Sequence, residues 1–98
     1  MMANTETVVS HLARLSQQFD LNRVSIGQIA RAKALATRLG RETCALARES
    51  LGGNGILLEN QVMKAMSDME AMYTYEGTYD INMLVSGREL TGGLAAFK

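Results

Sequence analysis

The 98-residue chain has no proline, no tryptophan and a single cysteine. The lack of proline and the single cysteine both limit which structures the chain can form. Without proline, no helix interior is interrupted by a residue that lacks a backbone N–H, so long helices are permitted. One cysteine, Cys44, cannot form an internal disulfide, and nothing near it has the Cys and His spacing of a metal site. We therefore expect a reducing, intracellular setting, no bound metal, and Cys44 packed as a small hydrophobic residue.

Net charge and long apolar runs are also missing. Ten Lys and Arg residues balance ten Asp and Glu residues, so no overall field attracts nucleic acid or an anionic membrane. No stretch approaches the roughly 20 apolar residues of a membrane-spanning helix. The segment Met1 to Glu6 lacks the basic and apolar blocks of a secretory signal. The sequence therefore predicts a soluble chain without nucleic-acid or membrane partners, in which any anionic ligand is held locally.

Alanine, leucine and seven methionines dominate the apolar residues, a composition that favours helices. A first helix is predicted from Thr7 to near Asp20, because apolar residues recur there at helical spacing, namely Val8, Leu12, Leu15 and Phe19. His11 is expected to point to solvent. A third helix is predicted through Val62 to Met69. A fourth is predicted to begin after Thr78, its N-cap, and to run through Leu94 towards Phe97. The second helix, between the first and the third, is the longest.

The second helix is the longest predicted element, running from Ile26 to Ser50. Ser25 and Gln28 have the spacing of a capping box at its start. One face carries the apolar stripe Ile29, Ala32, Ala36, Leu39, Thr43 and Leu46. The arginines lie on another face, which we expect to be solvated or to face a subunit. The many small residues of this helix are expected to let neighbouring helices approach closely.

Two segments between the predicted helices carry chemistry. The first, Gly52-Gly53-Asn54-Gly55, is either a helix stop or a turn whose unhindered N–H groups cradle phosphate. It lacks the Gly-Lys-Ser/Thr ending of a P-loop and follows no predicted strand. The second places Glu76 in a polar, aromatic break beside Gly77, where an acid is either merely solvated or catalytic. Residue types alone leave both alternatives open.

Together, in this order and at this separation, the segments Leu51-Gly-Gly-Asn-Gly-Ile56 and Tyr75-Glu-Gly-Thr78 resemble the C-terminal domain of acyl-CoA dehydrogenases. The resemblance continues through Asp80-Ile81, Gly87-Arg88 and Thr91-Gly92 to Ala96-Phe97, and covers nearly the whole chain. Within this family, the chain is most similar to the C-terminal domains of glutaryl-CoA dehydrogenases and of the related short-chain acyl-CoA oxidases of plant peroxisomes. The resemblance implies an all-α, four-helix bundle-like domain over residues 1–98, without the family's N-terminal helical and central β-domains.

The resemblance also implies roles for individual residues. Glu76 matches the family's glutamate that removes the α-proton of an acyl-CoA, and Gly77 matches a residue beside the substrate thioester. Contacts to FAD are implied for two segments and one late residue, namely Thr78, Tyr79 and Asp80, then Glu49, Ser50, Leu51, Gly52 and Gly53, and Phe97. Glu49 departs from the glutamine of many acyl-CoA dehydrogenases and agrees with the glutaryl-type branch.

In the family, the Glu49 to Gly53 segment contacts the flavin of a neighbouring subunit, so a homo-oligomer is implied, a tetramer in the family. The substrate is expected to be glutaryl-CoA or another short-chain acyl-CoA, with an electron-transfer flavoprotein or oxygen as the final acceptor. The mitochondrial matrix, the peroxisome and the bacterial cytoplasm are equally compatible with the sequence. The alternative hypothesis is a helical oligomerisation module that is derived from this family and has lost catalysis.

Overall fold

The computed structural model describes residues 1–92, which form four α-helices joined by short turns. These are α1 (Met2–Asp20), α2 (Ile26–Ser50), α3 (Val62–Thr74) and α4 (Tyr79–Leu90). Two 3₁₀ turns, η1 (Gly52–Ile56) and η2 (Leu58–Asn60), connect α2 to α3. No strand occurs in this part of the chain, so the predicted all-α fold is confirmed.

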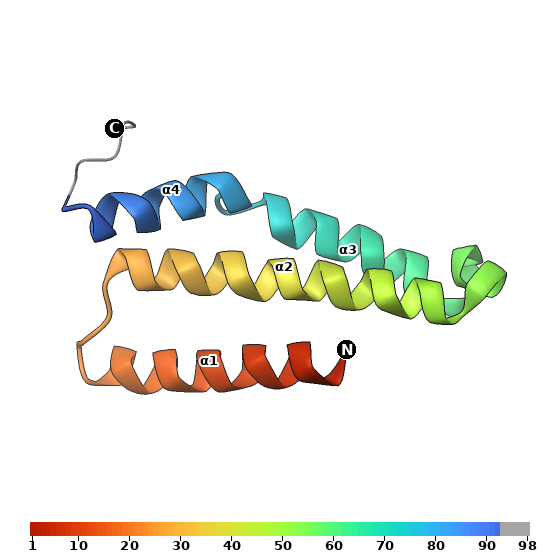
Figure 1. The fold of residues 1–98 in the computed structure, drawn as a ribbon, viewed down its shortest axis with the longest axis horizontal. Coiled ribbons are helices and arrows are strands. Elements are labelled where there is room, and N and C mark those ends of the chain that lie inside the picture. Colours follow the sequence, from red (N-terminus) through yellow and green to blue (C-terminus); the bar gives the residue numbers. More distant parts are fainter. Residues whose placement is uncertain (93–98) are drawn as a thin grey trace.

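The long helix α2 lies in the middle of the molecule. α1 runs along one side of it, while α3 and α4 follow one another along the other side (Figure 1). The result is an elongated body of 48 × 30 × 18 Å rather than a square bundle. Within the described residues, no helix is long and apolar enough to cross a membrane.

The start of α2 is held by the predicted capping box and by a contact from α4. The Gln28 N–H donates to Ser25 Oγ at 3.3 Å, and the Ser25 N–H donates to Gln28 Oε1 at 3.0 Å. Glu89 of α4 accepts from Ser25 Oγ at 2.6 Å and from the Gly27 N–H at 2.7 Å. These two bonds lower the pKa of Glu89, that from Ser25 having the larger effect. The end of α4 is thereby tied to the beginning of α2.

The buried core is narrow and made of small residues. Ala30, Ala32 and Ala34 of α2 are only 7%, 2% and 1% exposed, because helices pack on α2 from two sides. The expectation that small residues allow close helix approach is confirmed. Of the predicted apolar stripe only Ala32 is fully buried, and two members are exposed, Ile29 at 45% and Leu46 at 41%. The neighbouring helices cover the alanine-bearing sides of α2 instead.

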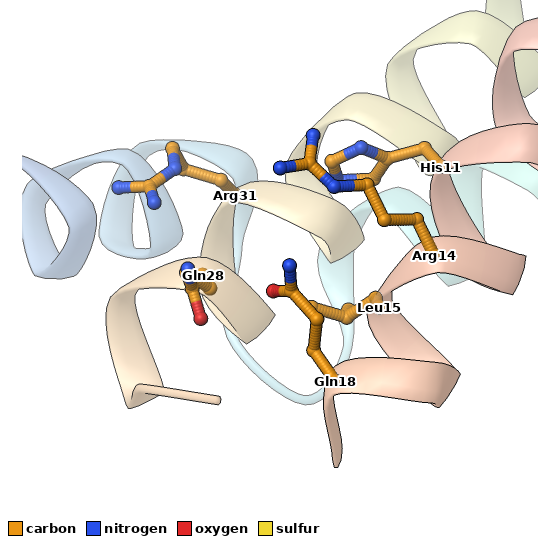
Figure 2. A pocket seen from close by; sticks show the side chains of 6 residues that line it. All are labelled: His11, Arg14, Leu15, Gln18, Gln28 and Arg31. Carbon is orange, nitrogen blue, oxygen red and sulfur yellow. The ribbon is translucent and has the colours of Figure 1, made fainter. Parts of the chain in front are cut away.

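The first helix differs from its prediction in three ways. It begins at Met2 rather than Thr7. Leu12 and Phe19, predicted on its apolar face, are 42% and 64% exposed. His11, predicted to point to solvent, faces α2, and its Nε2 is buried without a hydrogen-bond partner in the described residues (Figure 2). The physical reason is that α1 packs mainly against α2, so a single narrow face is covered and polar His11 lies on it.

The fourth helix ends earlier than predicted. Thr78 is its N-cap as expected, with Thr78 Oγ1 accepting from the Ile81 N–H at 3.2 Å. The helix stops at Leu90, and Gly92 follows with a φ of +67°, a conformation that suits glycine at a helix end. Leu94 and Phe97 lie outside the described residues.

Candidate base turn and glycine turn

The acid singled out in the sequence lies in a turn between α3 and α4, which we call the base turn (residues 75–77). Glu76 has a φ of +54° and Gly77 a φ of +95°, so two successive residues are left-handed. Glycine adopts this conformation readily, whereas holding another residue there costs roughly 1–3 kcal/mol and persists only when the surroundings enforce it. Such strain concentrates at functional sites, and here it falls on the candidate base.

The carbonyls on both sides of Glu76 are held by side chains from other elements. Lys33 Nζ of α2 donates to the Tyr75 carbonyl at 2.7 Å and to the Gly77 carbonyl at 2.6 Å. Asn82 Nδ2 of α4 also donates to the Gly77 carbonyl, at 3.0 Å. The Glu76 side chain itself is exposed, so the turn presents a carboxylate on a fixed backbone.

Thr78, Tyr79 and Asp80 form the N-terminal turn of α4, directly beside Glu76. The Ile81 N–H is satisfied by the Thr78 side chain, but the N–H groups of Tyr79 and Asp80 have no acceptor among residues 1–92. Open N–H groups at the positive end of a helix are suited to anionic oxygens such as those of a diphosphate. The residues present therefore fit a contact with the diphosphate of FAD at this end, although the nearby Asp80 carboxylate limits how closely an anion can approach.

An aromatic stack fixes the junction between α3 and α4. Tyr73 and Tyr79 stack with ring centroids 5.4 Å apart and planes 12° from parallel. Arg38 Nη1 donates to the Tyr79 hydroxyl at 3.0 Å, and Arg41 lies over the Tyr73 ring while pairing with Glu70 at 2.7 Å. Arg38 and Arg41 are exposed, as predicted for the arginine face, but they also anchor the junction to α2.

The glycine turn (residues 52–55) follows the C-terminal end of α2, well beyond Lys33, which touches the base turn. Gly52 has a φ of +59°, and neither Gly52 nor Gly53 has another group within 4 Å of where a Cβ would stand. Gly55 is buried, and a Cβ there would overlap the Arg48 carbonyl, so the chain turns back closely against the last turn of α2. The segment ends α2, which agrees with the first of the two interpretations of its glycines, a helix stop. Gly52 and Gly53 at its tip are exposed and unobstructed.

The two segments predicted to contact FAD are far apart within one chain. Lys33 touches the base turn, whereas Glu49 and Ser50 end α2, which places the segments roughly 25 Å apart at about 1.5 Å of rise per residue. One group of predicted site residues lies in the base turn and the start of α4, namely Glu76, Gly77, Thr78, Tyr79 and Asp80. The other group lies at the end of α2 and the start of the glycine turn, namely Glu49, Ser50, Leu51, Gly52 and Gly53. Phe97, the remaining predicted site residue, lies outside the described residues.

Sequence reasoning missed Lys33 and Asn82. No spacing marks Lys33, since its partners are 42 and 44 positions away in the chain. Asn82 is only five positions after Gly77, so its contact with the turn could have been inferred from their closeness in the sequence.

Cys44 is half-buried, and burial raises the pKa of its thiol, which agrees with a packing role rather than a reactive one.

A separate pocket of about 190 Å³ lies between α1 and α2 (Figure 2). It is lined mainly by polar and basic side chains, namely His11, Arg14, Leu15, Gln18, Gln28 and Arg31. Arg31 Nη1 donates from this region to Ser86 Oγ of α4 at 2.9 Å. None of the predicted site residues lines this pocket, so it is distinct from both turns.

The fold and the base turn define an all-α domain that presents one conformationally strained acid at a helix junction. The family model of the acyl-CoA dehydrogenase C-terminal domain matches residues 1–91. The crystal structure of glutaryl-CoA dehydrogenase from Mycobacterium smegmatis is similar with a TM-score of 0.85 and 32% sequence identity, over 92% of this chain. This chain therefore belongs to the acyl-CoA dehydrogenase C-terminal domain family. It covers 23% of the length of that solved relative.

Proposed function

We propose that this chain supplies the catalytic base of an FAD-dependent acyl-CoA dehydrogenase, with Glu76 removing the α-proton of an acyl-CoA thioester. The observation that carries the proposal is the left-handed backbone of Glu76, held between α3 and α4. Its position is the one that the resemblance of Tyr75-Glu-Gly-Thr78 assigns to the family's base. Backbone strain is often kept at functional positions. Because Gln61 is also left-handed, with a φ of +67° at the start of α3, the strain supports the proposal together with the position of Glu76 in the Tyr75-Glu-Gly-Thr78 segment.

In the proposed reaction, the Glu76 carboxylate takes a proton from the carbon next to the thioester carbonyl, and the electron pair of that C–H bond forms the new double bond. FAD, when bound, accepts the hydrogen of the β-carbon as hydride. Gly77 has no side chain, which leaves room for the thioester end of the substrate beside the base. Closing substrate over the exposed carboxylate removes water and raises its affinity for the proton.

For FAD, the open N–H groups of Tyr79 and Asp80, with Thr78, are the proposed contacts of this subunit. The Glu49 to Gly53 segment is the proposed contact to the flavin of a neighbouring subunit, because one flavin at the base turn lies too far from it within one chain. A homo-oligomer follows. The ring of FAD and most of the acyl-CoA need protein surface beyond these residues, so we expect the 98-residue chain alone to be inactive.

The substrate class proposed is glutaryl-CoA or another short-chain acyl-CoA, since the solved relative is a glutaryl-CoA dehydrogenase. The final electron acceptor, an electron-transfer flavoprotein or oxygen, and an intracellular location remain part of the proposal. Phe97 is proposed as a late flavin contact on the resemblance alone.

The test is a chimera in which this chain replaces the matching C-terminal segment of the Mycobacterium smegmatis enzyme. Glu76→Gln is compared with Glu42→Gln, an exposed glutamate on α2 away from both turns. We expect Glu76→Gln to abolish both flavin reduction and exchange of the substrate α-proton with heavy water, while Glu42→Gln retains both. If Glu76→Gln exchanges the proton at the parent rate, Glu76 is not the base.

A second candidate function is a helical oligomerisation module without catalysis. It is favoured by the large apolar side chains that α1 leaves exposed, among them Met2 at 76%, Val9 at 61% and Phe19 at 64%. Size-exclusion chromatography with flavin absorbance separates the two functions. An oligomer of the chimera that binds no flavin at any added concentration supports the module, whereas bound flavin supports the enzyme.

A further inference from the structure

Lys33 joins the middle of α2 to the base turn through two short hydrogen bonds. We propose that Lys33 is a positioning residue that holds Glu76 in its left-handed backbone conformation and so aims the carboxylate. This inference rests on the proposed function of Glu76 for its catalytic meaning. Its structural part, the control of one backbone conformation by one ammonium group, is independent of that function.

The geometry of the turn explains how a single ammonium group can do this. The Tyr75 carbonyl belongs to the peptide plane before Glu76, and the Gly77 carbonyl belongs to the plane after the left-handed pair. Both carbonyls accept from Lys33 Nζ, at 2.7 and 2.6 Å, so both oxygens face the same point on α2. An ammonium group has three N–H donors and can therefore bridge two acceptors. Holding both planes restricts the backbone dihedral angles of Glu76 and Gly77, the two residues between them.

No other described side chain replaces this bridge. Asn82 Nδ2 donates only to the Gly77 carbonyl, and the Thr78 cap acts after the turn. The Tyr75 N–H donates to the Ala71 carbonyl at 2.9 Å, which ends α3 but leaves the Tyr75 carbonyl itself unfixed. Among residues 1–92, Lys33 is the one donor to that carbonyl. Removing it frees the peptide plane directly before the base.

Lys33 is also well anchored and not engaged elsewhere. Its neighbours Ala32 and Ala34 are 2% and 1% exposed, so the backbone that carries it is packed in the buried core. The described residues offer it no ion pair, whereas Lys64, on the exposed face of α3, pairs with Asp68 at 2.9 Å. Lys33 lies 5.8 Å from the Tyr75 ring centroid, a further contact with the same turn. Its charge is thus directed to the base turn and not to a surface carboxylate.

The first experiment uses the 98-residue chain and needs no catalysis. A left-handed residue has a short distance between its amide proton and its own Hα, which gives a strong intraresidue nuclear Overhauser effect. We expect this signal for Glu76 in the parent and in Lys64→Met, and its loss in Lys33→Met. Lys33→Gln is the second variant, because it keeps a polar side chain and is milder should Lys33→Met fail to fold. Its amide has two N–H donors but is one bond shorter and uncharged, so we expect it not to reach both carbonyls. A strong Glu76 signal retained in a folded Lys33 variant overturns the proposal.

The second experiment measures catalysis in the flavin-loaded chimera. Displacing a catalytic group by about 1 Å costs on the order of 10²-fold in rate, so Lys33→Met is expected to lower kcat and α-proton exchange by that order. Substrate affinity and flavin absorbance should stay at the parent level, because the remaining site is intact. Lys33→Arg, which keeps two donors, should recover part of kcat, and adding Asn82→Ala to Lys33→Met should lower it further.

The outcomes separate the two proposals. If Glu76→Gln is inactive and Lys33→Met has the parent kcat, Glu76 is the base and the positioning role of Lys33 is wrong. If Glu76→Gln exchanges the α-proton normally, the proposed function fails, while the backbone measurement still decides whether Lys33 controls the turn. A fall in affinity without a fall in kcat after Lys33→Met contradicts positioning of the base.

Discussion

The same Gly→Ala substitution should have opposite effects at two glycines that are close in sequence. Gly77 lies in the base turn with a φ of +95°, whereas Gly87 lies within α4 with no group within 4 Å of a new Cβ. Alanine at Gly77 must adopt a left-handed conformation, which costs about 1–2 kcal/mol. Alanine at Gly87 gains about 0.5–1 kcal/mol, because glycine loses more conformational freedom in a helix.

A second cost at Gly77 comes from Asn82. The added Cβ would stand 3.1 Å from Asn82 Oδ1 and 3.3 Å from Nδ2, so the amide must move. Moving it weakens the bond from Asn82 to the Gly77 carbonyl, a bond worth about 0.5–1.5 kcal/mol. Reduced freedom of the unfolded chain returns about 0.4–1 kcal/mol. The net expectation is a loss of about 2 kcal/mol, or ~8–16 °C in Tm for a chain of this size.

Urea unfolding followed by circular dichroism measures both free energies of unfolding in the 98-residue chain. Gly87→Ala serves as the matched control, since it adds the same methyl group to the same chain. The reasoning is refuted if Gly77→Ala unfolds at the parent urea concentration while Gly87→Ala is stabilised. It is also refuted if both substitutions shift the midpoint in the same direction.

Two further predictions concern the ends of α2. The pKa of Glu89 is lowered from 4.5 by its bonds to Ser25 and Gly27, so its contribution to stability is present above that value and is lost as the pH falls through the lowered pKa. Glu89→Gln should therefore melt lower than the parent at neutral pH and approach it in acid, and thermal melts showing a gap that does not change with pH would contradict the assignment. At the other end, Gly55→Ala should destabilise the chain by about 1–3 kcal/mol, because the new Cβ meets the Arg48 backbone carbonyl. Gly53→Ala, at an open position, should change urea stability little, and equal effects at the two glycines would sink this argument.

Much of the fold was predictable because the signals are local. The capping box at Ser25 and Gln28, the N-cap at Thr78 and the glycine stop after α2 each involve residues within a few positions of one another. Each signal can be read from the sequence because its hydrogen bonds join residues only a few positions apart. The position of Glu76 between two helices was predictable for the same reason.

The orientation of α1 was not predictable from its own sequence. Helical spacing grouped Leu12 and Phe19 on an apolar face, but which side is buried depends on where α2 lies. Because α1 packs mainly against α2, a narrow face that includes His11 is covered, and both large apolar side chains stay exposed. Periodicity defines the faces of a helix and does not say how much partner surface is available.

By itself, the sequence determined the helical class, the bounds of α2 and the two turns, since each depends on interactions between near neighbours in the chain. The candidate base came from the resemblance of Tyr75-Glu-Gly-Thr78 to the acyl-CoA dehydrogenase family, because residue types alone left the role of Glu76 open. Only the tertiary structure decided that the two predicted flavin segments lie at separate places along α2. It also decided that Glu76 is left-handed and that Lys33, 43 positions earlier in sequence number, holds both carbonyls around it. Such contacts exist only after α2 and α4 have packed, because distance in space between remote residues is set by packing and not by spacing.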